Sequence, residues 1–440
     1  MNKYKDEMLE TLSDLIKIPS FKTEAKADAP FGEGPKAALI RFIEIADDLG
    51  FRTFNVDNYA GYAEFGPEDE SIPMIGIITH LDVVPADGWA DAYKPIIGDD
   101  IIIGRGSIDD KGPTVSVLYA LKSLMDEGYE PKTRIRLIVG TDEENGSECM
   151  QYYVKHAEVP VAAFTADFEF PVVNGEKGRV KFDLVWKDMD KRPQAGEYRL
   201  VSGESGHTAN IVPGEAKLTF QDEYGNLEEV ITQGESGHAS TPELYKNAAQ
   251  YALMDAKARL DEKGVQDPFL EDFSNLLNTE FNGEGLRIPF SDEPSGPLTV
   301  NLGIFRLDEN EARLTLDIRY PVTFRTEKIL ANADIATIRT GFTIENFSDS
   351  PALYRPESDP LVSLLTDAYN SVTGDNAKPI SIGGGTYARH VPNTLCFGAN
   401  FPGTKYLGHA DYEFASIPDI VKSSEVYKVA IVKMDEYYSK

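Results

Sequence analysis

Cysteine is scarce in this sequence of 440 residues, which contains only Cys149 and Cys396. Two cysteines so far apart exclude a disulfide framework and match no cysteine-based metal motif. The first residues of the sequence are charged and lack the apolar core of a secretion signal. These observations predict reduced thiols and a cytoplasmic protein.

The sequence is also poor in basic residues and in long apolar runs. Lysine and arginine number 43 against 73 aspartates and glutamates, so the formal net charge is −30. Such a charge argues against binding to the phosphates of nucleic acids and to anionic membrane surfaces. No apolar run approaches the roughly 20 residues of a membrane-spanning helix. We therefore expect neither a nucleic-acid partner nor a membrane contact.

What the sequence does contain fits a folded protein with more than one domain. Hydrophobic residues make up 41% of the sequence and charged residues 26%, which is typical of folded globular proteins. A chain of 440 residues is too long for one ordinary hydrophobic core, so two or more domains are expected.

The first 170 or so residues alternate between helical and strand patterns. Apolar stripes at helical spacing predict helices over residues 4–17, 35–49 and 114–127. Apolar or alternating runs predict strands over residues 52–56, 62–65, 75–78, 133–139 and 161–166. This order is typical of an α/β fold with a three-layer arrangement around a largely parallel sheet.

The pattern changes in the middle of the sequence and returns near the end. Strands such as 179–186 and 312–320 mix there with helices near 246–263 and 327–337, as in an α+β domain. From residue 360 onward the first pattern returns. We therefore predict one discontinuous domain, residues 1–172 and 352–440, and one inserted domain, residues 173–351.

The apolar run of residues 75–78 leads directly to His80 and Asp82. The run fits a strand that is buried on both faces, as in a parallel sheet. If the backbone stays extended, the two polar side chains share a face. Asp82 could then fix the tautomer of His80, as neighbouring carboxylates do for metal-bound histidines. The alternative is a strand end with two solvated polar residues, which this stretch alone does not exclude.

Further acidic and imidazole side chains lie near the ends of other predicted strands. In α/β sheets, functional sites form at the carboxyl ends of the strands, so these groups are candidates for one site. They are His80, Asp82, Asp109, Asp110, Glu143, Glu144, Asp167 and His409.

This set of side chains could bind two divalent ions that share one carboxylate. Imidazole nitrogen and carboxylate oxygen suit zinc, although cobalt and manganese accept the same ligands. Two such ions, about 3.5–4 Å apart, can hold a water between them and polarise a carbonyl group. We expect two divalent ions per chain, with zinc preferred over manganese or cobalt.

Glu143 and Glu144 are adjacent, and adjacent side chains of an extended segment point in opposite directions. One of them could therefore bind a metal ion while the other faces a substrate. The alternative is an acidic turn exposed to solvent, which is common in so acidic a sequence.

Six motifs, in order, resemble those of the M20 metallopeptidases, and most closely those of the dipeptidase PepV branch with its carnosinase-like enzymes. Each motif alone is weak, but their order along nearly the whole chain is specific. The motifs are Thr79-His-Leu-Asp-Val-Val84, Gly104-Arg-Gly-Ser-Ile-Asp-Asp-Lys-Gly112, Gly140-Thr-Asp-Glu-Glu144, Ala166-Asp-Phe-Glu-Phe-Pro171, Gly383-Gly-Gly-Thr-Tyr-Ala-Arg389 and the late His409.

The resemblance implies that His80, Asp109 and Asp167 bind one ion. Asp109 would be shared with a second ion, which Glu144 and His409 would complete. It also implies an α/β catalytic domain of the zinc-peptidase type with the insert as a lid.

The same resemblance assigns catalytic roles around these ligands. Asp82 would orient His80, and Glu143 would be the general base, a contribution of about 10²–10⁴-fold. The peptide bond between Asp109 and Asp110 would be cis.

The inserted domain would supply the contacts with the substrate. His238, in a Gly-His-Ala-Ser-Thr-Pro segment, would donate a hydrogen bond to the tetrahedral oxyanion. Asn210 would contact the substrate, and the guanidinium of Arg319 would hold its C-terminal carboxylate. His207 follows the same Gly-Glu-Ser-Gly sequence as His238 and is a rival for its role.

Gly384 and Gly385 belong to a run of three glycines that lacks the Gly-Lys-Ser/Thr of a phosphate-binding loop. Their expected function is a tight turn whose backbone approaches the substrate. Without the resemblance, Arg319 would be interpreted as a surface residue of a strand and Asn210 as a turn residue.

We therefore expect a two-metal dipeptidase that cleaves short unmodified dipeptides, such as Xaa-His or β-alanyl dipeptides. Other amidohydrolases of the family are alternatives, namely an N-acyl amino acid deacylase, a succinyl-diaminopimelate desuccinylase or a carboxypeptidase. A non-catalytic metal- or peptide-binding protein is a more distant alternative.

The insert differs from the PepV branch between Pro213 and His238, where a helical unit is missing. The insert is nevertheless longer than a simple dimerising lid. This length favours a monomer that supplies His238 itself, with a homodimer as the alternative.

Overall fold

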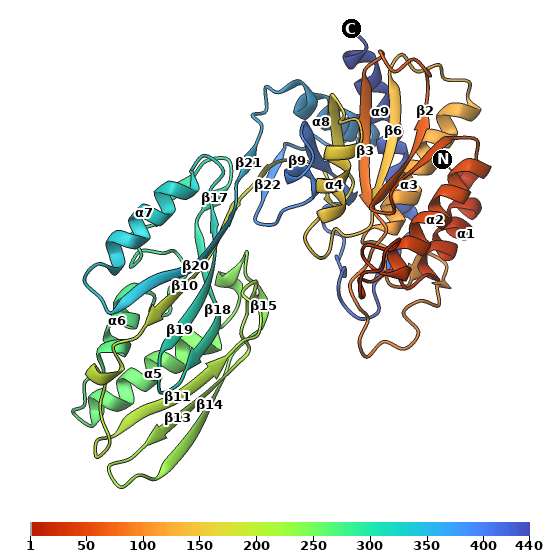
Figure 1. Ribbon diagram of the computed structural model, residues 1–440. Coiled ribbons are helices and arrows are strands. Elements are labelled where there is room, and N and C mark those ends of the chain that lie inside the picture. Colours follow the sequence, from red (N-terminus) through yellow and green to blue (C-terminus); the bar gives the residue numbers. More distant parts are fainter. Residues whose placement is uncertain (1) are drawn as a thin grey trace. The chain divides into compact units, whose positions relative to one another are not determined.

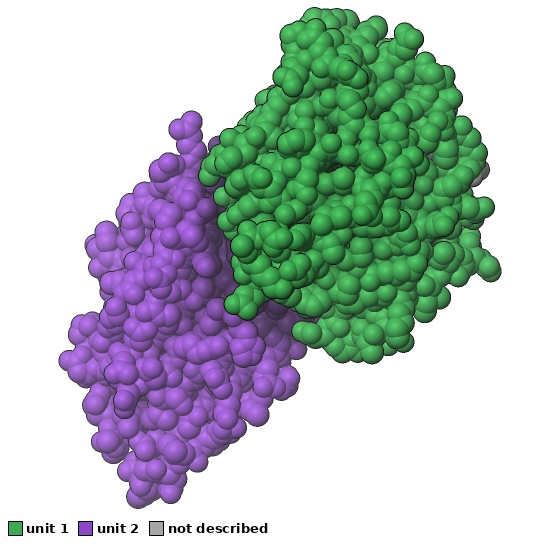
Figure 2. Space-filling view, turned by 45° about the vertical axis from the view of Figure 1, so that its right-hand side comes forward, with its two compact units in different colours: residues 1–174, 355–380, 385–440 green, residues 175–354, 381–384 purple. Residues whose placement is uncertain are grey.

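The computed structural model describes residues 2–440, which form two compact units (Figures 1 and 2). Unit 1 comprises the residues up to 174 together with 355–380 and 385–440, and unit 2 comprises 175–354 and 381–384. The domain boundaries predicted from the sequence assign residues 381–384 to the first domain, whereas in the structure they belong to unit 2. They group with unit 2 because the Ile382 carbonyl accepts the Lys177 N–H at 2.9 Å and the Gly383 carbonyl accepts the Arg319 guanidinium at 2.9 Å.

A nine-stranded sheet runs in the order β1-β2-β6-β3-β7-β23-β9-β21, with β22 paired to β9. Its central strands β6, β3, β7 and β23 are parallel to one another. Every residue of β3 is buried, as its apolar run predicted. The strands are β1 (Arg52–Val56), β2 (Ala60–Phe65), β3 (Met74–His80), β6 (Arg134–Gly140), β7 (Ala162–Thr165), β9 (Val172–Glu176), β21 (Leu353–Tyr354), β22 (Ile380–Ile382) and β23 (Thr394–Phe397).

Helices cover both faces of the parallel part of this sheet (Figure 1). The α/β fold predicted from the sequence is therefore confirmed. The α8 helix shows why the boundaries fall where they do, because Asp359 caps its first turn, Pro360 opens it and Gly374 ends it in a left-handed conformation. The helices are η1 (Asn2–Tyr4), α1 (Lys5–Ile16), α2 (Glu33–Asp48), α3 (Lys111–Asp126), α4 (Glu148–His156), α8 (Pro360–Thr373), η4 (Tyr387–Arg389) and α9 (Ile417–Tyr438).

Two small sheets in unit 1 join segments that are far apart in the sequence. β25 (Phe414–Ser416) pairs with β5 (Ile101–Ile103), which pairs with β4 (Ile96–Ile97). β24 (Ala399–Asn400) pairs with β8 (Phe168–Glu169). The first of these sheets ties the chain after His409 to the chain before Asp109.

Unit 2 is built on an antiparallel sheet in the order β14-β13-β11-β18-β19-β10-β20. Alternate residues of β10, such as Val180, Phe182 and Leu184, point into a core that α5 and α6 also line. The stretch between Pro213 and His238 contains the hairpin β13–β14 and no helix. The larger elements are β10 (Gly178–Trp186), β11 (Arg199–Ser205), β13 (Glu215–Gln221), β14 (Leu227–Gln233), α5 (Ala248–Glu262), α6 (Pro268–Leu276), β18 (Thr299–Leu307), β19 (Ala312–Tyr320), α7 (Thr326–Thr337) and β20 (Phe342–Ser350).

Short elements complete unit 2, and they are η2 (Met189–Lys191), β12 (Ile211–Val212), β15 (Gly237–His238), η3 (Pro242–Leu244), β16 (Ser291–Asp292) and β17 (Gly296–Pro297). Across both units, the helices within residues 2–440 include none with the length and apolarity to cross a membrane.

Candidate metal centre

The parallel strands β6, β3 and β7 bring three chain segments to one edge of the sheet. His80 ends β3 and lies opposite Gly140, the last residue of β6, so the segment with Glu143 and Glu144 begins beside it. Asp167 follows β7 closely on the other side of β3. The convergence expected from the strand order is therefore present in the structure.

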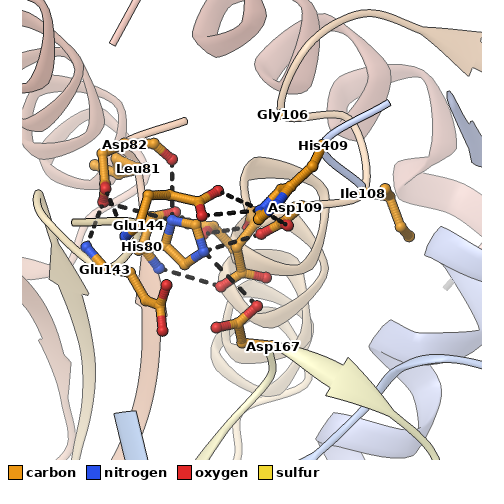
Figure 3. A network of polar contacts seen from close by, with 12 residues as sticks. His80, Leu81, Asp82, Gly106, Ile108, Asp109, Glu143, Glu144, Asp167 and His409 are labelled. Atoms are coloured by element: carbon orange, nitrogen blue, oxygen red, sulfur yellow. Dashed lines mark hydrogen bonds and ion pairs between the residues drawn. The ribbon is translucent and has the colours of Figure 1, made fainter. Parts of the chain in front are cut away.

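The first group of possible metal ligands contains His80, Asp109 and Asp167. The His80 Nε2 atom lies 3.1 Å from Asp109 Oδ1 and 3.7 Å from Asp167 Oδ1. All three side chains are largely shielded from solvent, and that of His80 is completely buried. Figure 3 shows them directed toward one another.

The second group contains Asp109, Glu144 and His409. The His409 Nε2 atom lies 3.1 Å from Asp109 Oδ2 and 2.9 Å from Glu144 Oε2. Asp109 therefore turns one carboxylate oxygen toward His80 and the other toward His409 (Figure 3). A carboxylate placed in this way can serve two ions at once.

The protonation of the second group reflects its concentration of negative charge. Burial would lower the pKa of His409, but hydrogen bonds to Asp109 and Glu144 raise it to about 11. Burial and the charge of Asp109 raise the pKa of Glu144 to about 7. The carboxylates around His409 thus favour a positive charge at this position.

The residues present fit divalent metal ions. Each group offers one imidazole nitrogen and carboxylate oxygens within 4.8 Å of one another, and both belong to the ligand types that zinc accepts. Asp110 is a further buried acid, and burial together with the charge of Asp167 raises its pKa well above its usual value. One oxygen of Asp110 lacks a hydrogen-bond partner among the described residues.

Asp82 contacts its neighbours differently from the sequence-based expectation. The His80 Nδ1–H donates to the backbone carbonyl of Asp82 at 2.9 Å, while the Asp82 carboxylate lies 3.5 Å from Nδ1. The carboxylate instead accepts the backbone N–H groups of Glu143 and Glu144, at 3.1 Å each. Asp82 therefore holds His80 mainly through its main chain and the two glutamates through its side chain.

Glu143 and Glu144 lie in a turn, so the expectation of an extended segment was wrong. The turn is closed by the Gly146 N–H, which donates to the Glu143 carbonyl at 3.3 Å, and by the Ser147 N–H, which donates to the Asp142 carbonyl at 2.7 Å. The two side chains still diverge, since Figure 3 shows Glu144 directed to His409 and Glu143 away from it. Burial and the charge of Asp167 raise the pKa of Glu143 well above its usual value.

The peptide bond between Asp109 and Asp110 is cis, as the resemblance implied. The Asp110 carboxylate accepts the backbone N–H of His80 at 3.1 Å. Asp110 therefore fixes the end of β3 from the start of α3.

Unit 2 brings His238 and Asn210 together. β15, which ends at His238, pairs with β12, and the Asn210 carbonyl accepts the Ala239 N–H at 3.0 Å. The Ser240 backbone N–H donates to His238 Nδ1 at 3.2 Å, so the ring proton of a neutral His238 lies on Nε2. The rival, His207, is exposed in the segment after β11.

Arg319 is buried in unit 2 rather than exposed at a strand surface. Its Nε donates to Asp317 at 2.6 Å, and Arg179 donates to the same carboxylate at 2.7 Å. These two arginines lie directly opposite each other on β10 and β19. The Asp317 carboxylate thus binds both guanidinium groups.

The glycine run packs closely against its surroundings. A side chain at Gly383 would meet Ser240 at 2.8 Å, and one at Gly385 would meet Arg389 at 2.5 Å, whereas one at Gly384 would only touch Ile382, at 4.0 Å. None of the three has a positive φ, so close packing explains Gly383 and Gly385 better than turn geometry does. Gly384 belongs to unit 2 and Gly385 to unit 1.

Sequence reasoning missed three side chains at the centre. The Tyr406 hydroxyl donates to Asp109 Oδ2 at 2.7 Å, and the ring of Tyr387 meets the ring of His80 edge-on at 6.2 Å. The Glu413 carboxylate accepts backbone N–H groups of the loop that carries Asp109. Only the closeness of Tyr406 and Glu413 to His409 in the sequence could have indicated them.

Comparison with known proteins identifies the class to which this fold and site belong. The family model described as peptidase family M20/M25/M40 matches residues 76–433. The chain therefore belongs to this peptidase family and is a peptide hydrolase.

A relative from Staphylococcus aureus (strain bovine RF122), named "putative dipeptidase", is 34% identical over 466 aligned residues, which cover 99% of this chain and 98% of the relative. Because the alignment is longer than the 440-residue chain, this chain carries deletions relative to that protein. Human carnosine dipeptidase 1 has a similar fold, with a TM-score of 0.60 and 13% identity over 99% of this chain and 97% of that one. Aminoacylhistidine dipeptidase from Vibrio alginolyticus has a TM-score of 0.60 and 14% identity over 98% and 96% of the two chains.

Proposed function

We propose that this protein is a two-metal dipeptidase that hydrolyses the peptide bond of short unmodified dipeptides. The observation that carries the proposal is the pair of ligand groups that share Asp109 beside a half-buried glutamate, Glu143. Relatives named as dipeptidases, and the fold shared with dipeptidases that act on carnosine and aminoacylhistidine, support the substrate class.

Five residues would hold the ions, namely His80, Asp109, Asp167, Glu144 and His409. When bound, two divalent ions would lower the pKa of a water between them and polarise the scissile carbonyl. The mixed nitrogen and oxygen ligands favour zinc, and manganese or cobalt would also be accepted.

Glu143 is the general base of the proposed reaction. Its backbone is fixed by Asp82, and burial together with the charge of Asp167 raises its pKa, which favours the uptake of a proton. The Glu143 carboxylate would accept the proton of the attacking water and pass it to the nitrogen of the leaving amine.

Residues of unit 2 would bind the substrate. His238, with its proton on Nε2, would donate to the oxyanion, and Asn210 would contact the substrate beside it. Arg319 would bind the C-terminal carboxylate, because a guanidinium can bind a carboxylate through two parallel hydrogen bonds and Arg179 lies opposite it in the strand register. The backbone at Gly384, which is the least crowded of the three glycines, would approach the substrate together with that of Gly385.

A substrate panel tests the proposed function. The protein is reconstituted with zinc, manganese or cobalt and is assayed on free dipeptides, including Xaa-His and β-alanyl dipeptides. N-acetyl amino acids, N-succinyl amino acids and longer peptides are assayed in parallel, because they are the substrates expected of the alternative functions. Turnover of free dipeptides above the other classes supports the proposal. Turnover restricted to N-acyl amino acids, or to longer peptides, would contradict it.

The monomeric state and the cytoplasmic location remain predictions of the sequence. Both cysteines are buried free thiols in the structure, which is compatible with a reducing compartment.

A further inference from the structure

Glu413 is a fully buried carboxylate that accepts four hydrogen bonds. Its Oε2 atom accepts from the Arg105 guanidinium at 2.8 Å and from the Gly106 N–H at 3.0 Å. Its Oε1 atom accepts from the Ile108 N–H at 2.9 Å and from the Asp109 N–H at 3.2 Å. The glutamate therefore holds the main chain of the loop that presents Asp109.

The same contacts reach the segment that presents His409. Glu413 follows His409 by four residues, and its own carbonyl accepts the Gly104 N–H at 3.0 Å. Arg105, besides binding Glu413, donates from Nη2 to the His409 carbonyl at 3.4 Å. Pairing of β5 with β25 continues this connection on the far side of Glu413. Hydrogen bonds thus hold together the segment with Asp109 and the segment with His409, which are about 300 residues apart in the sequence.

A buried ion pair is a poor way to stabilise a fold, because desolvation of both charges offsets their attraction. The arrangement of donors around Glu413 indicates instead that this residue fixes the main chain beside Asp109. Three of the four donors are main-chain N–H groups of residues 106, 108 and 109, where the last carries the carboxylate shared by the two ligand groups. Partners of this kind fix the direction of a metal ligand and affect metal affinity by about 10–100-fold.

We infer that Glu413, braced by Arg105, is a positioning residue that sets the spacing between Asp109 and His409. It thereby determines the affinity of the ligand group of Asp109, Glu144 and His409 for its ion. The inference rests on the proposed two-metal function. Glu413 itself touches neither substrate nor metal in this account.

The first test is Glu413→Gln, which keeps the shape of the side chain. An amide turns its NH₂ group toward two of the N–H donors, so half of the contacts become repulsive. Zinc and manganese binding to the metal-free protein is measured by equilibrium dialysis. We expect one ion to bind with nearly wild-type affinity and the second to bind about 10–100-fold more weakly. Dipeptide turnover should then be recovered by excess metal.

A second readout needs no metal at all. Amide hydrogen exchange of the metal-free protein should be faster at Ile108 and Asp109 in Glu413→Gln than in the wild type, because these N–H groups lose their acceptor. Arg105→Lys is the second variant in case the first does not fold. Lysine keeps a positive charge beside Glu413 but cannot also donate to the His409 carbonyl as the arginine fork does. We therefore expect a selective decrease in the affinity for the second ion that is smaller than in Glu413→Gln.

The matched control is Asp435→Asn. Asp435 is also fully buried and also accepts main-chain N–H groups, those of Lys132 and Thr133, the latter at 2.6 Å. These residues precede β6, so they lie at the opposite end of that strand from Glu144. Asp435→Asn should lower the stability of the fold while leaving both metal affinities unchanged.

The outcomes separate this inference from the proposed function. Selective loss of one ion in Glu413→Gln, absent in Asp435→Asn, supports the inference. Unchanged metal affinities in Glu413→Gln, or equal losses of affinity in Glu413→Gln and Asp435→Asn, would overturn the inference about Glu413. The proposed function would still stand in that case if the wild type binds two ions and cleaves dipeptides. A wild type that binds fewer than two ions would overturn both.

Discussion

The His80 ring donates from Nδ1 to the main-chain carbonyl of Asp82, at 2.9 Å. This hydrogen bond leaves Nε2 as the atom that faces Asp109 and Asp167. The Asp82 carboxylate is engaged elsewhere, because it accepts the N–H groups of Glu143 and Glu144. One residue therefore orients a possible metal ligand through its backbone and the proposed base through its side chain.

Asp82→Asn should weaken metal binding and catalysis together. An amide can accept with only one of its two end atoms, so Glu143 or Glu144 loses its N–H acceptor. We expect a loss of about 10–100-fold in metal affinity or in kcat, measured by metal titration and dipeptide hydrolysis. Asp222→Asn is the control, because the half-buried Asp222 likewise accepts two backbone N–H groups, those of Tyr224 and Asn226. Equal behaviour of the two variants would argue against this function of Asp82.

Arg319→Lys should discriminate between substrates with and without a free carboxylate. Lysine keeps the charge but loses the planar fork that binds a carboxylate through two parallel hydrogen bonds. We expect kcat/KM to fall by at least about tenfold for a free dipeptide and much less for its C-terminal amide, since about 1.4 kcal/mol corresponds to tenfold. Arg179→Lys, which alters the other partner of Asp317, is the control. A fall of equal size for both substrates would show that Arg319 is only structural.

His238→Ala should lower kcat while leaving metal content unchanged. Removal of one donor to the oxyanion typically costs about 10²–10³-fold in kcat. His207→Ala is the control, because His207 follows the same four residues as His238 and is exposed. Steady-state kinetics on one dipeptide check the prediction. A decrease in kcat for His207→Ala but not for His238→Ala would instead assign the donation to the oxyanion to His207.

Lys111 should make the stability of the fold depend on pH. Its buried ammonium donates to the carbonyls of Leu15 and Ile18, each at 2.9 Å, and burial lowers its pKa to about 7. The pKa of an unfolded lysine is about 10.4. Between these values the unfolded chain binds a proton that the folded chain has released, so stability rises with pH.

Urea unfolding at several pH values between 7 and 10 measures this effect. As the pH increases across this range, the free energy of unfolding of the wild type should increase by up to about 4 kcal/mol relative to that of Lys111→Met. Parallel pH profiles of the two proteins would contradict the assignment.

The sequence predicted the elements of the fold well where periodicity was strong. The apolar stripe of α2, with Ala38, Leu39 and Phe42, marks the buried face of the helix. The helix predicted over residues 114–127 begins three residues too late, because Gly112 and Pro113 are residue types typical of a loop. Proline is tolerated in the first turn of a helix, where its missing N–H would have no acceptor, so α3 begins at Lys111.

The site was predictable only in part. Strand order alone brings His80, Glu144 and Asp167 to one edge, whereas the inclusion of Asp109 and His409 came from the family motifs. Glu413 follows His409 by four residues, but this closeness alone does not distinguish it from its acidic neighbour Asp411. Its contacts depend on the pairing of two strands 300 residues apart, which no local pattern reveals.

Comparison of the wild type with Glu143→Gln tests the central claim most directly. Metal bound per chain and hydrolysis of one free dipeptide are measured on the same reconstituted samples. The account predicts two ions in both proteins and a kcat for Glu143→Gln that is at least about 10²-fold lower. A Glu143→Gln protein as active as the wild type, or a wild type that cleaves the dipeptide equally well after removal of metal, would contradict it.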